Sequence, residues 1–371
     1  MKIAGIVAEF NPFHTGHKYL LDKTREMGFS HIAVCLSSDL TQRGDLSVFD
    51  KRTRAVSAIQ NGADLVLELP FPFSMSCAEV YAKKSVEIFK SVGIDALVFG
   101  CETVDKPLLL QAAKESVLLK ENSEVLSLIK SGESYPAAAC GVLERKAGKQ
   151  IAQIFKSPNA TLAIEYIKAL GDTPFFPVLR TSPHDSDKLC EFASASKIRA
   201  ELRQGNSEVL KYLPYKAPDN LSAITKIERA IILSLCQTDK DSLLEISDVN
   251  EDLANRLINA SKKATTLDEL LNLSKTKAYT MSRIKRCVMN TYLGVRKEDL
   301  SLPVYIRPIA ANDRGIEILS LSPVKAEASL KAIEKTHPRL TYLSYLVDRL
   351  YDMCLEKPCG SNEYTKPFIK L

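Results

Sequence analysis

The chain has 371 residues, a net charge of +5 and an isoelectric point near 8.6, and 45% of its residues are hydrophobic. This composition is that of a folded globular protein and excludes wholesale disorder. No apolar run is long enough to span a membrane, and the opening MKIAGIVAEF is too short for a signal peptide, so we expect a cytoplasmic protein.

The first hundred residues predict a parallel sheet. Continuous apolar runs at 3–8, 31–37, 65–69 and 96–99 alternate with stretches of helical spacing at 17–27, 51–61 and 78–92. Strands buried on both faces and separated by helices are typical of a doubly wound, Rossmann-like α/β fold. Ligands in such sheets bind beyond the carboxyl ends of the strands, so we expect the site there.

The pattern then becomes mainly helical from 106 to 170, and PFFPVLR at 174–180 predicts a fifth strand. We expect a domain boundary within 204–218, where Gly205, Pro214 and Pro218 interrupt the pattern. The prediction is an α/β domain at 1–205 and a mainly helical C-terminal domain at 206–371. The second domain should contain helices near 225–236, 252–262, 267–273 and 281–293, and a strand at 304–308.

Nine cysteines are present, an odd number, and no two form a C-x-x-C pair. Many lie in apolar runs such as IAVCLSS, where a free thiol acts as a small core residue. We therefore expect free thiols and no structural zinc.

The segment EFNPFHTGH lies between the first strand and the first helix. The unpaired N–H groups and the dipole of a helix start favour an anion there. Gly16 would let the backbone pass close to a nucleotide. His14 and His17, with Lys18 as a third donor, could donate hydrogen bonds to phosphate oxygens whose charge grows as pyrophosphate departs. The alternative is that His14 caps the helix and His17 packs on its surface.

A second segment, SASKIR at 194–199, places small hydroxyl residues at a helix start. Lys197 and Arg199 follow and could reach a triphosphate. The alternative is a solvated helix start with scattered positive charge.

Together, HTGH and SASKIR resemble the two signatures of the H-x-G-H nucleotidyltransferases. The match is narrower when GIVAEFNPFHTGHKYLL, TQRG, DLVLELPFPF, ALVFGCE, SYPAA and KSPNATLAIEYI are included. In that order these segments resemble the bacterial tRNA(Met) cytidine acetate ligase family over most of residues 1–205. The similarity continues more loosely through YTMSRIKRC and PVYIRPIAANDRGIEILS.

The resemblance implies an enzyme that activates acetate with ATP to an acetyl-adenylate. The acetyl group would then pass to N4 of the wobble cytidine in the anticodon loop of elongator tRNA(Met). Mg²⁺ is expected with the ATP, although the motifs identify neither its protein ligands nor any protein partner. Because the mixed anhydride supplies a good leaving group, no protein nucleophile is needed.

The resemblance also assigns site residues. Stabilisation of phosphate charge falls to His14, His17, Lys18 and Arg199. The nucleotide-binding residues that it implies are Val7, Ala8, Glu9, Phe10, Asn11, Pro12, Phe13, His14, Thr15, Gly16, His17, Lys18, Tyr19, Leu20, Gly100, Asn159, Arg180, Ser196, Lys197 and Arg199.

A basic stretch in the second domain suggests an RNA-binding surface. Between Arg256 and Lys297, ten basic residues face two acidic ones, with Tyr279 and Tyr292 among them. A solvated basic helix face is the alternative. The candidate RNA contacts are Lys275, Lys277, Arg283, Lys285 and Arg286, together with Arg43 of TQRG, which could equally be a salt-bridged loop arginine.

Three questions about function stay open from the sequence. His184 and Asp185 in SPHDSD could contact a ribose or an anticodon base, or form an ordinary polar turn. The chain could be a nucleotidyltransferase acting on a small metabolite or a protein acceptor. It could also be a non-catalytic tRNA-binding protein that keeps a nucleotide pocket, although the intact HTGH and Arg199 favour an enzyme.

Overall fold

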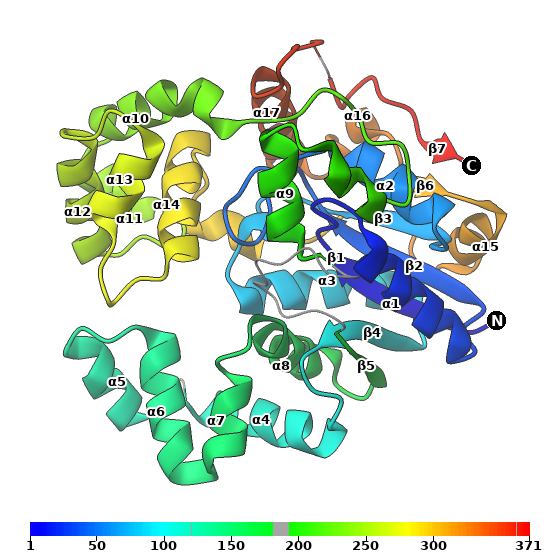
Figure 1. Cartoon of the computed structure of the whole chain (residues 1–371), viewed down its shortest axis with the longest axis horizontal. Coiled ribbons are helices and arrows are strands. Elements are labelled where there is room, and N and C mark those ends of the chain that lie inside the picture. The colour runs from blue at the N-terminus through cyan, green and yellow to red at the C-terminus, as the bar shows by residue number, and fades with distance from the viewer. Residues whose placement is uncertain (120, 181–192, 361) are drawn as a thin grey trace.

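The computed structural model describes residues 1–119, 121–180, 193–360 and 362–371. Its centre is a seven-stranded sheet with the order β5-β4-β1-β2-β3-β6-β7 (Figure 1). The first five strands are parallel, β6 runs antiparallel to β3, and β7 is parallel to β6. The strands are β1 (Ile3–Ala8), β2 (His31–Ser37), β3 (Leu65–Leu69), β4 (Ala96–Cys101), β5 (Phe175–Leu179), β6 (Pro308–Ala311) and β7 (Ile369–Lys370).

The five parallel strands lie where the sequence predicted them, and both faces of the sheet are buried. Along each strand, side chains alternate between two cores. Ile3 and Leu65 pack in one core with helix α3 (Ala78–Val92), and Ala4 and Val66 pack in the other with helices α1 (Thr15–Glu26) and α2 (Lys51–Gln60). The predicted doubly wound α/β fold is confirmed.

A helical extension occupies the chain between β4 and β5, and its last helix, α8, packs beside α3 on the sheet (Figure 1). Its members are α4 (Lys106–Leu119), α5 (Ser123–Lys130), α6 (Tyr135–Ala147), α7 (Lys149–Ile154) and α8 (Pro158–Leu170). A single 3-10 turn, η1 (Phe73–Met75), follows β3.

A second helical group, residues 224–295, follows β5 in the chain, and its core also includes Leu40, Leu46, Phe71 and Met75. The helices predicted near 225–236, 252–262, 267–273 and 281–293 are confirmed there. The elements of residues 193–360 besides β6 are α9 (Ala195–Arg203), η2 (Ser207–Tyr212), η3 (Ile224–Ile227), α10 (Glu228–Gln237), α11 (Lys240–Glu245), α12 (Glu251–Ser261), α13 (Leu267–Ser274), α14 (Met281–Leu293), η4 (Lys297–Ser301), α15 (Asp313–Leu321), α16 (Leu330–Ile333) and α17 (Pro338–Met353).

The strand predicted at 304–308 was wrong in position, because the structure places it at Pro308–Ala311. Proline has no N–H to donate, so it is tolerated as the first residue of a strand, and Pro308 begins β6 instead of ending it. β6 and β7 join a sheet whose other strands precede residue 180. The sheet thus contains strands from both sides of the boundary predicted within 204–218. That residues 1–205 bind ATP and residues 206–371 bind tRNA stays a prediction.

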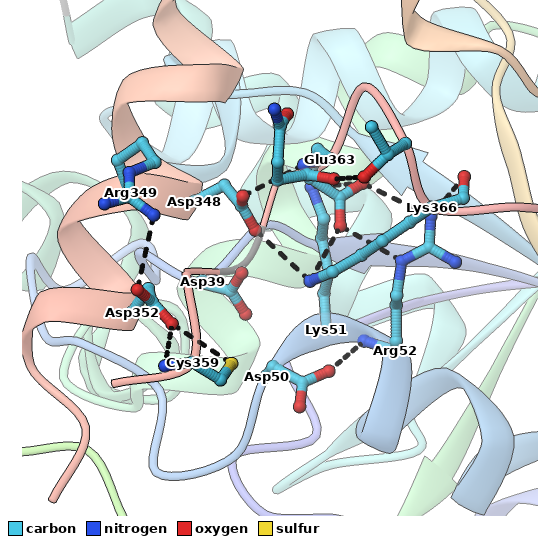
Figure 2. Close-up of polar contacts among 12 residues, drawn as sticks. Asp39, Asp50, Lys51, Arg52, Asp348, Arg349, Asp352, Cys359, Glu363 and Lys366 are labelled. Carbon is cyan, nitrogen blue, oxygen red and sulfur yellow. Dashed lines mark hydrogen bonds and ion pairs between the residues drawn. The ribbon is translucent and has the colours of Figure 1, made fainter. Parts of the chain in front are cut away.

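A buried ionic network fastens the C-terminal segment to the sheet. The side chains of Lys51, Glu68, Arg307 and Glu363 are each at most 4% exposed. Glu68 pairs with Lys51 at 2.6 Å and with Arg307 at 3.0 Å, and Glu363 pairs with Arg307 at 2.8 Å. Figure 2 shows Arg52 converging on Glu363 from α2, where the two form an ion pair at 3.0 Å.

Two further observations concern the described residues alone. No helix among them combines the length and the apolar character needed to cross a lipid bilayer. None of the eight cysteines among them forms a disulfide, and five of these are buried. Cys190, His184 and Asp185 lie outside the described residues.

Candidate active site

The HTGH segment forms the start of α1, directly beyond the carboxyl end of β1. His14 is the N-cap residue, and its Nδ1 accepts a hydrogen bond from Gly16 N at 3.0 Å. In return, His17 Nδ1 accepts a hydrogen bond from His14 N at 3.3 Å. A Cβ atom on Gly16 would approach His14 Cε1 to 2.8 Å, so a side chain at this position would displace the imidazole.

This arrangement fixes the protonation of both histidines. Burial, and then the charges of Arg180 and Arg199, lower the pKa of His14 to about 3. Burial, and then His14 and Arg180, hold the pKa of His17 well below 6.5. Both rings are therefore neutral near pH 7, and since each Nδ1 accepts a hydrogen bond, each Nε2 carries the proton. The capping role proposed as the alternative is real, and it leaves two Nε2–H donors at a helix N-terminus.

Arg199 reaches this loop from a helix almost two hundred residues later. Helix α9 begins at its cap residue Ser194, whose Oγ accepts from Lys197 N at 3.3 Å. Arg199 Nη1 donates to Asn11 O at 2.6 Å, and Asn11 Oδ1 accepts from Val48 N at 2.8 Å. Burial lowers the pKa of Arg199. The segment SASKIR therefore contacts Asn11, three residues before HTGH in the segment EFNPFHTGH.

The carboxyl ends of β1 and β4 lie side by side, because Ala4 pairs with Ala96. β2 and β4 lie on opposite sides of β1 in the sheet, so the strand order reverses at β1. In open α/β sheets this switch point is where ligands bind. HTGH follows β1, and Gly100 lies in β4, so the predicted nucleotide residues meet at the switch point.

Arg180 and Asn159 complete the β4 side of the site. Arg180 N donates to Cys101 O at 3.0 Å, and a Cβ atom on Gly100 would meet Arg180 Cγ at 3.5 Å. Arg180 Nε is buried and has no hydrogen-bond partner among the described residues. Asn159 Nδ2 donates to Glu102 Oε1 at 2.7 Å.

The other predicted phosphate ligands point elsewhere. Lys18 pairs with Asp22 at 2.8 Å on the exposed side of α1, and Lys197 pairs with Glu201 at 2.7 Å within α9. Ser196 Oγ lies 3.1 Å from the capping Ser194 Oγ. These lysines therefore do not join the two histidines in this conformation.

Within the predicted loop at 7–20, several side chains support the backbone instead of facing a ligand. Phe10 and Phe13 are buried and meet edge to face at 4.8 Å. Phe10 has a φ of 46°, an unusual value for a residue with a side chain. Thr15 Oγ1 is buried and has no hydrogen-bond partner among the described residues. Val7, Ala8, Tyr19 and Leu20 pack partly buried against the two cores of the sheet.

The sequence analysis missed Arg54, which is fully buried. Its guanidinium donates to Glu9 O at 2.6 Å, to Ser38 O at 2.9 Å and to Asp39 Oδ1 at 3.0 Å. It thus joins the ends of β1 and β2 beneath the loop. The segment KRTR is typical of an exposed, basic helix start, and nothing in its local pattern indicates that Arg54 is buried.

The predicted RNA contacts fall into two groups. Arg283 donates to Asp248 O at 2.9 Å, and Arg286, which is buried, donates to Asp248 Oδ2 at 2.7 Å. These two, with Lys285, hold α14 against neighbouring segments. Lys275 and Lys277 are exposed between α13 and α14.

Arg43 lies in the loop that joins β2 to α2. Its charge acts to lower the pKa of both Arg180 and Arg199, in addition to their burial. This places Arg43 near Arg180 and Arg199, and its role in RNA binding stays a prediction.

Comparison with known proteins agrees with this geometry. A family model described as HIGH Nucleotidyl Transferase matches residues 1–365. The tRNA(Met) cytidine acetate ligase of Streptococcus mutans is 34% identical over 319 residues, which is 85% of each chain. The enzyme of that name from Syntrophomonas wolfei is 32% identical and covers 89% of this chain and 86% of its own.

Two crystal structures of Thermotoga maritima TmcAL cover the whole of both chains. The apo form has a TM-score of 0.89 with 25% identity, and the form bound with alpha-thio ATP has a TM-score of 0.87 with 26% identity. With the family model and the relatives, these matches show that the chain belongs to the HIGH nucleotidyl transferases and, among them, to the tRNA(Met) cytidine acetate ligase family.

Proposed function

We propose that this protein uses ATP to activate acetate and transfers the acetyl group to N4 of the wobble cytidine of elongator tRNA(Met). The observation that carries the proposal is the pair of neutral imidazoles at the start of α1, each with an Nε2–H donor, beside Arg199 and Arg180. Its relatives are named as enzymes of this activity, and one structural neighbour binds an ATP analogue.

In the first step, an acetate oxygen bonds to the α-phosphorus of ATP as the bond to the bridging oxygen breaks and pyrophosphate leaves. Negative charge builds on the departing phosphates, and preorganised donors stabilise it. His14 and His17 would supply neutral N–H donors, and Arg199 and Arg180 would supply positive charge. Because the two rings are already neutral and fixed by backbone hydrogen bonds, they need no rearrangement as the charge develops.

In the second step, the N4 lone pair of cytidine attacks the acetyl carbon, the anhydride C–O bond breaks, and AMP leaves while N4 loses a proton. The amine is weakly nucleophilic because its lone pair is delocalised into the ring. The activated anhydride compensates for this. A base in an anticodon loop is unpaired and reachable without opening a helix.

Mg²⁺ would neutralise part of the triphosphate charge. No group of three His, Cys, Asp or Glu side chains among the described residues is placed to hold a metal ion. We therefore propose that the phosphates supply most of its ligands, as is common for magnesium in nucleotide sites.

We assign ATP binding to residues 1–205 and tRNA binding chiefly to 206–371, where Lys275 and Lys277 are exposed. The substrates, ATP and tRNA, place the reaction in the cytoplasm. Selecting one tRNA requires contacts away from the reacting base, which a second region can supply.

The test is nucleoside mass analysis of unmodified elongator tRNA(Met) incubated with the protein, ATP, Mg²⁺ and isotope-labelled acetate. We expect labelled N4-acetylcytidine with the wild type and with the control His337→Ala, and none with His17→Ala. AMP and pyrophosphate without label in RNA would redirect the search to another acceptor. ATP binding without any turnover would support a binding protein instead.

A further inference from the structure

Glu102 lies one residue beyond β4, at the switch point of the sheet, and holds the start of α8. One carboxylate oxygen accepts from Asn159 Nδ2 at 2.7 Å, and the other accepts from Ala160 N at 2.9 Å. The N-cap residue Ser157 makes no side-chain capping hydrogen bond, so Glu102 satisfies a backbone donor that the helix itself leaves open.

The contact with Glu102 fixes which way the Asn159 amide faces. An ionised carboxylate can only accept hydrogen bonds, so the amide must turn its NH₂ group toward Glu102. The amide oxygen is then directed away from Glu102, and it accepts no hydrogen bond from the described residues. Asn159 therefore presents an acceptor whose orientation a charged neighbour sets.

Its contact with Glu102 places Asn159 at the carboxyl end of β4, beside the switch point. Glu102 follows Gly100 and Cys101 of β4. Burial lowers the pKa of Arg180, and the negative charge of Glu102 partly opposes this effect. The positive charge of Arg180 in turn helps to lower the pKa values of His14 and His17. His14, His17 and Arg199 surround the loop after β1, which suits them to the phosphates, and a nucleotide held there would extend its nucleoside past Arg180 toward Asn159.

We propose that Glu102 is a positioning residue for nucleotide selection, because it turns Asn159 Oδ1 toward the 6-amino group of adenine. A ribose hydroxyl both donates and accepts, so it would tolerate either amide orientation. An exocyclic amine only donates, and guanine carries an acceptor, O6, in the same place. A fixed acceptor thus favours ATP over GTP. The proposal deepens the function above and rests on it.

The variant Glu102→Gln gives a directional test. The backbone N–H of Ala160 cannot change its role, so the single amide oxygen of the new glutamine stays with it. The NH₂ group of the glutamine then faces Asn159, whose amide must turn over and present a donor to the base. We expect weaker ATP binding and stronger GTP binding, so that the ratio of the two dissociation constants changes at least about tenfold, the effect of one hydrogen bond.

Titration calorimetry on the full chain with Mg²⁺ would measure ATP, GTP, 2′-deoxy-ATP and 3′-deoxy-ATP. The matched control is Glu144→Gln, an exposed glutamate on α6, which should bind like the wild type. Asn159→Ala should lose the preference for ATP while Glu102 still accepts from Ala160 N. In that background Glu102→Gln should have no further effect on the ratio, because the effects of two coupled residues are not additive.

Several outcomes would overturn the proposal. If Glu102 only caps α8, the effects of Glu102→Gln and Asn159→Ala will be independent, and every nucleotide will weaken equally. Losses confined to the deoxy nucleotides would place a ribose hydroxyl at Asn159. Should Glu102→Gln fail to fold, an unchanged ATP-to-GTP ratio in Asn159→Ala would be enough to reject the proposal.

The proposed function is tested separately in the same samples. If the wild type binds ATP and catalyses acetate-dependent exchange of pyrophosphate, but Glu102→Gln binds each nucleotide like the wild type, the inference fails and the function stands. If the wild type does not bind ATP, both fail.

Discussion

Lys285 Nζ and Asp45 Oδ1 form an ion pair at 2.6 Å that joins helix α14 to the loop after β2. Beside this pair, Arg286 Nη1 donates to Gln42 O at 3.3 Å, and Gln42 N donates to the Glu9 carboxylate at 2.9 Å. A chain of direct contacts therefore runs from the second helical group to the HTGH loop.

Apolar packing reinforces this junction. Leu40 and Leu46 of the same loop are buried in the core formed by α10 and α12–α14. Burial lowers the pKa of Arg199, and the negative charges of Asp45 and Glu9 partly oppose this by raising it. The loop thus contacts the helical group through Leu40, Leu46 and Asp45, and it contacts Glu9 at the end of β1 through Gln42.

We predict that Gly44→Ala loosens this junction. Gly44 has a φ of +79°, and an added Cβ would meet Lys285 Cβ at 2.7 Å and Arg286 N at 2.9 Å. The positive φ should cost about 1 kcal/mol, and the collision about 1–3 kcal/mol more. Urea denaturation would measure the loss in the free energy of unfolding.

The matched control is Gly132→Ala, at a φ of +99° with no atom near the added Cβ. It carries the backbone strain without the collision. Equal losses in the two variants would show that the contact with α14 is unimportant.

A second prediction separates RNA contacts from structural ones. Lys277→Ala should weaken tRNA binding and reduce the slope of log affinity against log salt by about 0.7–0.9, the value of one lost phosphate contact. Its melting temperature should not change, because Lys277 is exposed. Filter binding at several salt concentrations would measure the slope.

Lys285→Ala is the comparison. It removes a half-exposed ion pair worth at most about 1 kcal/mol, so we expect a small loss of stability. A large drop in salt slope for Lys285→Ala, with none for Lys277→Ala, would reverse the assignment.

The sequence predicted those features that depend on local pattern. β1, β2 and β3 match their apolar runs, since a strand buried on both faces is continuously apolar. HTGH was found because its residue types and its position after a strand both carry chemical meaning. The contact of Arg199 with Asn11, in the same loop, spans 188 residues, and only the pairing of two motifs predicted that the two segments meet.

Other features depend on long-range contacts that no local pattern reveals. β6 has four residues and begins with proline, so it carries a weak strand signal. Charged side chains are usually exposed, yet three basic residues are buried among partners from other segments: Lys51, Arg54 and Arg307. Glu102 is the last residue of ALVFGCE and carries no motif of its own, because its contacts with Asn159 and Ala160 depend on α8 packing beside β4.

A third prediction concerns the buried network around Glu363, which Figure 2 shows among its polar neighbours. Glu363→Gln should destabilise the protein by about 3–5 kcal/mol, because it leaves Arg307 and Lys51 with Glu68 as their main acidic partner inside the protein. Urea unfolding should show this loss. Glu251→Gln, which breaks an exposed pair with Lys240, should leave the midpoint unchanged, and similar midpoints in both variants would contradict a buried network.

The last prediction is a loss of stability in mild acid. The pKa of His14 is about 3 in the folded protein and near 6.5 when the chain unfolds. Below pH 6.5 the unfolded state therefore binds a proton that the folded state does not, so stability falls as pH drops from about 6.5 toward 3. At pH 5 the loss from His14 alone should be about 2 kcal/mol, and the lowered pKa of His17 adds to it.

Urea unfolding at pH 7 and pH 5 would measure this loss in the wild type and in His14→Asn. Asparagine keeps a side-chain oxygen that can cap α1 but does not titrate, so the variant should lose about 2 kcal/mol less between the two pH values. Asp39, whose pKa burial raises to about 6, also titrates in this window, but it does so in both proteins and cancels from the difference between them. An equal loss in both proteins would mean that His14 titrates normally and would remove the argument that it reaches the phosphates as a neutral donor.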